Sequence, residues 1–115
     1  MPLVKLSVST TVADDKREEV LKGTSKIITE YTGKPERYVM VTLATEAVML
    51  AGSSGAGAFA DIRGIGGLTP EVNKKISDKL CNLLNQTLRI PTVRTYITFT
   101  DVPASNWGWN GSTFG

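Results

Sequence analysis

Histidine is absent from this sequence, and cysteine occurs only once, as Cys81. The lack of histidine excludes Ser-His-Asp triads, histidine metal ligands and histidine pH switches. A single cysteine can form neither an internal disulfide nor an all-thiolate metal site. We therefore expect no metal and no other cofactor. Acid–base chemistry near neutral pH must come from another kind of group.

Long apolar runs and a strong excess of one charge are also missing. No apolar stretch approaches the roughly 18 residues of a membrane span. The N-terminus has no basic segment followed by an apolar run, so we expect no secretory signal, no membrane contact and a cytoplasmic location, with non-classical secretion left open. Lys and Arg number 13 against 11 Asp and Glu. No basic stripe with interleaved aromatic residues occurs, which argues against nucleic-acid binding.

The remaining composition is that of an ordinary globular protein, with 41% hydrophobic and 21% charged residues. A chain of 115 residues suits one domain, which we place at residues 1–115, and it buries enough surface for a core without cross-links. Partial alternation of apolar and polar residues predicts a strand over residues 3–8. Further strands are predicted over residues 38–43, 58–62 and 93–102.

Two segments have the apolar spacing of amphipathic helices. Apolar residues recur every three or four positions over residues 20–31 and again over residues 72–88. Asp14 is the expected N-cap of the first helix, and Gly33 is its expected C-terminal stop. Thr69, followed by a proline and an acidic residue, is the expected N-cap of the second helix.

The two halves of the chain repeat at a shift of 56 positions, which places apolar residues on apolar residues, for example Val20 on Ile76 and Ile28 on Leu84. This pattern predicts two tandem β-α-β units with right-handed crossovers. The expected fold class is α+β, with a four-stranded sheet, two helices on one sheet face and short extra strands. The other sheet face would stay uncovered, which favours an oligomer.

A tandem β-α-β repeat that begins with Met-Pro resembles the macrophage migration inhibitory factor family of the tautomerase superfamily. The resemblance runs from end to end of the chain. It rests on Met-Pro at residues 1–2, Thr-Gly-Lys-Pro at 32–35, Gly-Ser-Ser at 52–54, Ile-Gly at 65–66, Arg-Thr-Tyr-Ile at 94–97 and Gly-Trp-Asn-Gly-Ser-Thr-Phe at 108–114. It implies a homotrimer with sites at the subunit boundaries and a small-molecule 2-oxo acid as substrate.

The resemblance makes Pro2 the catalytic residue. Removal of Met1 would leave a secondary amine at the chain terminus. Burial and a nearby lysine both lower the pKa of such an amine from the roughly 7.7–8.0 of an ordinary α-amino group. An amine of this kind is a general base near neutral pH. Taken without the resemblance, Pro2 fits better as the start of an edge strand, where a missing N–H does no harm.

The resemblance also implies six substrate-binding residues. Lys34 would bind the substrate carboxylate, and the backbone N–H of Ile65 would contact the substrate. Tyr96 would reach the site from a neighbouring subunit, with Thr98 two positions further along the strand. Trp107 and Phe114 would form the rim of the pocket. Each has a structural alternative: a solvated lysine at a helix end, a hinge in a glycine-rich turn, a cross-strand aromatic residue, or packing of the C-terminal turn.

Two of these residues depart from the vertebrate members of the family. Those members carry Asn in place of Thr98 and a small aliphatic residue in place of Trp107. A hydroxyl reaches less far than an amide, and a larger ring narrows the mouth of the pocket. We therefore expect slow turnover of the aromatic substrates that the family usually takes.

The expected activity is keto–enol tautomerisation of the phenylpyruvate or dopachrome type. A second interpretation, from a different class, is a cytokine-like protein that signals by binding a receptor and keeps only a vestigial pocket; the sequence shows no receptor surface. A third is hydrolytic dehalogenation or hydration, for which related enzymes add Arg and Glu residues that we do not find here. Conversion of phenylpyruvate, compared with a Pro2→Ala variant, distinguishes these interpretations.

Overall fold

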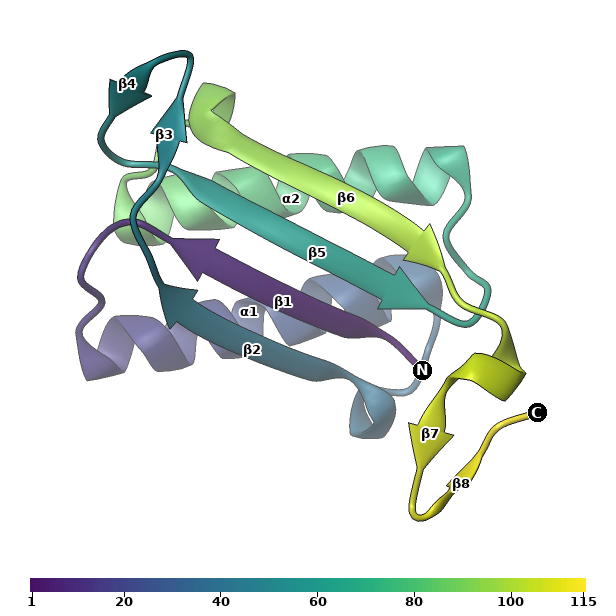
Figure 1. The fold of residues 1–115 in the computed structure, drawn as a ribbon. Coiled ribbons are helices and arrows are strands. Elements are labelled where there is room, and N and C mark those ends of the chain that lie inside the picture. Colours follow the sequence, from purple (N-terminus) through teal and green to yellow (C-terminus); the bar gives the residue numbers. More distant parts are fainter.

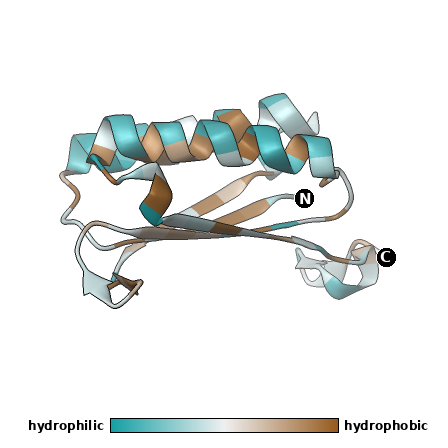
Figure 2. Ribbon diagram, turned by 90° about the horizontal axis from the view of Figure 1, so that it is seen from above, coloured by the Kyte–Doolittle hydropathy of each residue, from teal (hydrophilic) through white to brown (hydrophobic).

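The computed structural model describes residues 1–115 as two layers, a sheet and a pair of helices (Figure 1). Four strands form the main sheet in the order β2-β1-β5-β6. Their bounds are Leu3–Val8 for β1, Met40–Thr45 for β2, Ala58–Gly64 for β5 and Thr95–Asp101 for β6. Helices α1 (Asp14–Thr32) and α2 (Pro70–Leu88) both cover the same face of the sheet, as Figure 2 shows. The predicted α+β architecture is confirmed.

The internal repeat is visible in the topology. Strands β1 and β2 are parallel, as are β5 and β6, and the central pair β1 and β5 is antiparallel. The shift of 56 positions carries both ends of α1 onto the ends of α2. It also carries the short 3₁₀ helix η1 (Glu36–Tyr38) onto η2 (Thr92–Arg94). The chain is therefore two β-α-β units joined back to back through their first strands.

The core lies between the helices and the inner face of the sheet. Alternate residues of the two central strands point into it, as the period of two in a strand requires. The helices contribute residues spaced three or four apart, which is why the helical periodicity of the sequence predicted them. Fully buried members are Val4, Leu6, Val8, Val20, Ile28, Ala60, Ile62, Ile76, Leu80 and Leu84.

Both predicted caps that depend on special backbone geometry are confirmed. Gly33 ends α1 in the left-handed conformation, with a φ of 73°, and its N–H donates to the Thr29 carbonyl. The Thr69 hydroxyl accepts a hydrogen bond from the Val72 N–H at 3.2 Å. The prediction of Asp14 as an N-cap is wrong. Ala13 occupies that position, and Asp14 is instead the first helical residue.

Two strands begin later than the sequence predicted, for the same reason. A strand was expected from residue 38, but the N–H of Tyr38 donates to the Pro35 carbonyl at 3.1 Å, which closes a 3₁₀ turn before β2. In the second unit, the N–H of Arg94 donates to the Pro91 carbonyl at 2.9 Å, so β6 begins at Thr95 instead of residue 93. In each unit a proline starts the turn, because its fixed φ suits that position.

Two small hairpins lie at opposite ends of the sheet (Figure 1). One pairs β3 (Met49–Leu50) with β4 (Ser53–Ser54). The other pairs β7 (Gly108–Trp109) with β8 (Ser112–Thr113) and follows the 3₁₀ helix η3 (Ala104–Asn106). This second hairpin lies at the same end as the N-terminus. No helix combines the length and apolar composition that a membrane span requires.

Candidate functional site

Pro2 lies buried immediately before β1 and, together with Met1, lines a cavity of about 360 Å³. The Pro2 carbonyl accepts a hydrogen bond from the N–H of Met40, which fixes the terminus against β2. Most of the lining is apolar, and four lining residues are aromatic: Tyr38, Trp107, Trp109 and Phe114. Arg37 is the one charged side chain in the lining. The cavity therefore suits a small, flat, partly apolar molecule that carries a negative charge.

The C-terminal segment forms one wall of this cavity. The β7–β8 hairpin turns at Asn110 and Gly111, both with positive φ, as a tight Asn-Gly hairpin turn requires. The turn lets the rings of Trp109 and Phe114 stack, with centroids 5.7 Å apart and planes 14° apart. The N–H of Phe114 donates to the carbonyl of Trp107 at 3.2 Å. These contacts hold a rigid aromatic wall beside Pro2.

Lys34 reaches the same end of the sheet from the C-terminus of α1. Just after the turn at Gly33, the Lys34 N–H donates to the Thr32 hydroxyl at 3.2 Å. This contact directs the chain so that the Lys34 ammonium donates to the carbonyl oxygen of Ile65 at 3.1 Å. The two residues come from different repeat units, and each limits the movement of the other.

Ile65 lies in the turn that follows β5, residues 64–67. Gly66 and Gly67 both have positive φ, of 69° and 82°. The N–H of Gly66 donates to the Asp101 carboxylate at 2.8 Å. The N–H of Ile65 itself donates to no acceptor in the protein. A free backbone donor beside a lysine ammonium forms an anion-binding pair.

The electrostatics at the amino terminus favour a neutral amine. Burial lowers the pKa of the Met1 amino group below its ordinary value of 8.0, and the positive charge of Lys34 lowers it further. Both effects act because a charged amine is disfavoured away from water and next to another cation. A basic nitrogen at this position therefore loses its proton more readily than one in solution.

Tyr96 and Thr98 do not join this group within one chain. Leu3 pairs with Arg63, and Arg63 pairs with Thr100, so the Pro2 end of β1 lies level with the end of β6. Tyr96 is four residues earlier on β6, about 13 Å away along the sheet at a rise of about 3.3 Å per residue. It lies on the uncovered sheet face and is 65% exposed. Of the seven predicted site residues, one chain brings five to the same end of the sheet.

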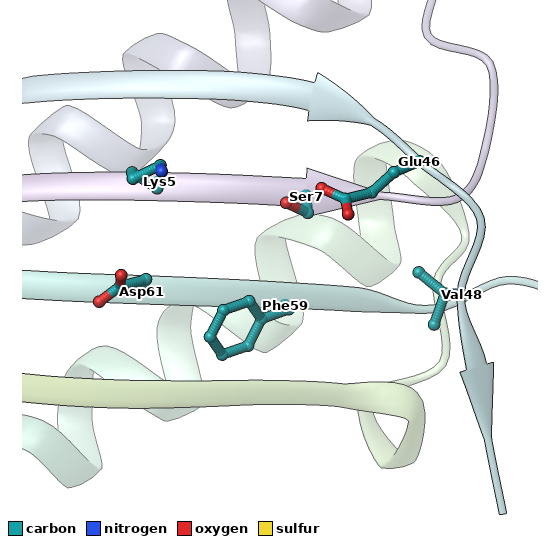
Figure 3. Close-up of a pocket in the computed structure, with 6 residues that line it drawn as sticks. All are labelled: Lys5, Ser7, Glu46, Val48, Phe59 and Asp61. Atoms are coloured by element: carbon teal, nitrogen blue, oxygen red, sulfur yellow. The ribbon is translucent and has the colours of Figure 1, made fainter.

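A second hollow, of about 290 Å³, opens on the uncovered face of the sheet (Figure 3). It is lined by Lys5, Ser7, Glu46, Val48, Phe59 and Asp61. Asp61 is held by the guanidinium of Arg63 at 3.1 Å, and none of the predicted site residues lines this hollow. No group of three acidic, histidine or cysteine side chains gathers to hold a metal ion. The cavity at Pro2 is therefore the better candidate site.

The sequence analysis did not single out four residues at the site. Arg37 and Tyr38 lie in η1, and the guanidinium of Arg37 stacks 4.7 Å above the Tyr38 ring. A strand was predicted from residue 38, so the sequence analysis did not predict the 3₁₀ turn that exposes Arg37 and Tyr38. Trp109 was part of a recognised motif, but no periodic pattern predicts that its ring stacks on another. The contact between Asp101 and the N–H of Gly66 joins residues 35 positions apart, so no local sequence pattern predicts it.

Comparisons with known proteins match the chain from end to end. The family model described as Macrophage migration inhibitory factor (MIF) matches residues 1–115. A macrophage migration inhibitory factor homolog of Trichinella spiralis is 36% identical over 115 residues, covering 99% of this chain and 100% of that one. The macrophage migration inhibitory factor of Xenopus tropicalis is 34% identical over 110 residues, covering 94% of this chain and 96% of that one.

Solved structures give the same result for the fold. The crystal structure of a macrophage migration inhibitory factor-like protein from Entamoeba histolytica has a TM-score of 0.94 at 31% identity and covers 98% of each chain. The homologue from Prochlorococcus marinus has a TM-score of 0.92 at 36% identity, covering 98% of this chain and 99% of that one.

Proposed function

Because this chain belongs to the macrophage migration inhibitory factor family, we propose that it is a keto–enol tautomerase of 2-oxo acids whose general base is the nitrogen of Pro2. The observation that carries the proposal is the position of Pro2, which is buried and lines an aromatic cavity. Burial and Lys34 lower the pKa of the Met1 amino group, and we expect both to act in the same way on a free Pro2 amine one residue further along. Removal of Met1 converts the Pro2 nitrogen from an amide into a secondary amine with a free electron pair.

The proposed reaction moves one proton. The Pro2 nitrogen takes the proton from the carbon next to the ketone, and the electron pair of that C–H bond forms the C=C bond of the enolate. The ketone oxygen then carries the negative charge until the protonated Pro2 nitrogen gives the proton to it, which forms the enol; the reverse path regenerates the ketone. A base whose pKa lies near the working pH can both accept and return that proton.

Lys34 and the N–H of Ile65 are proposed to hold the acidic end of the substrate. An ammonium has three donors, and Lys34 uses one on the Ile65 carbonyl at 3.1 Å, so two remain for a carboxylate. The free N–H of Ile65 adds a donor that is already in place. Donors fixed before the reaction stabilise developing oxygen charge without further reorganisation. Trp107 and Phe114 would hold the aromatic end of the substrate.

We further propose that the active form is a homotrimer in which Tyr96 and Thr98 serve the site of a neighbouring subunit. The uncovered sheet face supports this, since it exposes Phe59 at 41% and Tyr96 at 65%. Strands β2 and β6 are also open edges, which can pair with another chain. Sedimentation equilibrium should give three times the mass of one chain. A stable monomer at micromolar concentration would contradict the shared site.

The test of the activity is conversion between the enol and keto forms of phenylpyruvate. The wild-type protein should accelerate it, and Pro2→Ala should lose part of the rate, because a primary amine replaces the ring nitrogen and the terminus is less rigid. A wild-type rate no higher than that of Pro2→Ala would instead favour the second interpretation, a receptor-binding protein with a vestigial pocket. The cytoplasmic location expected from the sequence stays a prediction.

A further inference from the structure

Asp101 joins the end of the sheet to the turn that carries Ile65. It is the last residue of β6 and pairs with Gly64, the last residue of β5. Its Oδ1 atom accepts a hydrogen bond from the N–H of Gly66 at 2.8 Å. The next residue, Val102, donates its N–H to the Gly64 carbonyl at 2.8 Å. The end of β6 thus holds the turn through one side chain and one backbone group.

Apart from these contacts, the one hydrogen bond that holds the turn is the one from the Lys34 ammonium to the Ile65 carbonyl. No hydrogen bond within residues 65–67 closes it, and Gly66 and Gly67 both adopt positive φ. Glycine samples more backbone conformations than any other residue, so two in succession make a flexible hinge unless something fixes them. A carboxylate that accepts a backbone N–H forms a stronger bond than a neutral acceptor does. Asp101 therefore selects one conformation of the hinge.

We propose that Asp101 is a positioning residue for substrate binding, an inference that rests on the proposed tautomerase activity. By fixing Gly66, the carboxylate sets the direction of the free N–H of Ile65, one residue earlier. It also sets the carbonyl of Ile65, which is the acceptor of the Lys34 ammonium at 3.1 Å. One contact therefore orients both donors that receive the substrate carboxylate. Asp101 itself need not touch the substrate.

A purely electrostatic role makes a different prediction. A negative charge near Lys34 and the terminal amine would raise the pKa of that amine, so that loss of the charge would move the pH dependence of the rate. A positioning role depends on an acceptor oxygen at this place and not on its charge. Asp101→Asn separates the two, because the amide keeps an oxygen acceptor and loses the charge.

The experiment compares phenylpyruvate kinetics in the wild type, Asp101→Ala and Asp101→Asn, with Met1 removed in all three. Asp101→Ala should raise KM and lower kcat/KM by about three- to tenfold, the range for losing one ordinary hydrogen bond, because Asp101 acts on the substrate only through the turn. Asp101→Asn should recover most of that loss, and the midpoint of the pH–rate curve should be the same in all three proteins. Asp15→Ala is the matched control, since Asp15 has no hydrogen bond or ion pair and its loss changes the net charge equally.

Amide hydrogen exchange at Gly66 supplies a readout that does not require turnover. Exchange should be slow in the wild type and in Asp101→Asn and fast in Asp101→Ala, with unchanged thermal unfolding showing that the variants fold. An active wild type with unchanged KM in Asp101→Ala would overturn the positioning role alone. So would a shifted pH midpoint in Asp101→Asn without recovery of KM. An inactive wild type would overturn the proposed function and the positioning role with it. This would hold even if amide hydrogen exchange showed that the Gly66 N–H binds Asp101.

Discussion

The ammonium of Lys34 and the carbonyl oxygen of Ile65 lie 3.1 Å apart although 31 residues separate them in the chain. The contact joins the helix end of the first repeat unit to the strand end of the second. It places a cation where it lowers the pKa of the Met1 amino group, beside a residue whose backbone N–H has no acceptor in the protein. Base and anion-binding donors thus meet at one end of the sheet.

Replacing Lys34 with Ala should weaken substrate binding and change the pH dependence of the rate. Loss of a charged donor should lower kcat/KM for phenylpyruvate by about ten- to a hundredfold, chiefly through KM. Because Lys34 lowers the pKa of the terminal amine, its removal should move the midpoint of the pH–rate curve upward. Lys26→Ala, which removes an exposed lysine of α1, is the control and should change neither quantity. Equal midpoints in wild type and Lys34→Ala would show that the lysine does not act on the base.

Replacing Thr24 with Val should stabilise the fold. Thr24 is fully buried in α1, and its hydroxyl oxygen has no hydrogen-bond partner. Valine has nearly the same shape and removes an unsatisfied polar group, so the free energy of unfolding should rise by about 1 kcal/mol. Chemical denaturation measures this change.

The matched control is Thr87 in α2, which is also buried. Its hydroxyl donates to the Glu19 carboxylate at 2.8 Å, so Thr87→Val breaks a real contact. The same substitution should therefore lower stability at residue 87 and raise it at residue 24. Two changes of the same sign would show that the hydroxyl contacts do not decide the outcome.

The thiol of Cys81 should react slowly. Burial raises its pKa above the ordinary value of 9.0; the nearby Asp78 charge adds to this, and a hydrogen bond with Ser77 opposes it. The thiolate is the reactive form, so a raised pKa leaves less of it at neutral pH. Iodoacetamide should alkylate Cys81 more slowly than free glutathione at pH 7, and the rate should rise with pH. Faster alkylation than glutathione would contradict this account.

The sequence predicted the features that local patterns determine. The helical spacing around Ile28 and Leu84, the αL stop at Gly33 and the cap at Thr69 all depend on neighbours within a few residues, and the structure confirms them. Asp14 is not the N-cap because the helix begins one residue earlier than predicted, so that Asp14 is its first residue. There it lies in the positive first turn and pairs with Arg17 at 2.7 Å.

The contacts that assemble the site could not be predicted in this way. Gly66 meets Asp101 only because β5 and β6 pair in parallel with Gly64 opposite Asp101. That register comes from packing of the whole sheet and leaves no periodic signal near either residue. Lys34 and Ile65 were named through a family resemblance, and their contact with each other was not foreseen. The sequence therefore indicated which residues form the site, whereas the contacts between those residues could be identified only from the fold.

The central claim is that the free nitrogen of Pro2 is the base, and the measurement that tests it combines intact mass with rate. Two preparations should be compared. In the first, Met1 is removed from every chain. In the second, a residue inserted between Met1 and Pro2 blocks the removal of Met1, so that Met1 stays on every chain. Chains that begin at Pro2 should turn over phenylpyruvate, with a rate that rises with pH through one ionisation below that of an ordinary α-amino group. This direction is expected because burial and Lys34 both lower the pKa of the Met1 amino group, and the Pro2 nitrogen lies one residue further along in the same surroundings. Chains that keep Met1 should fold identically and be inactive, because an amide nitrogen cannot take the proton. Full activity in protein whose mass shows Met1 on every chain would contradict the account.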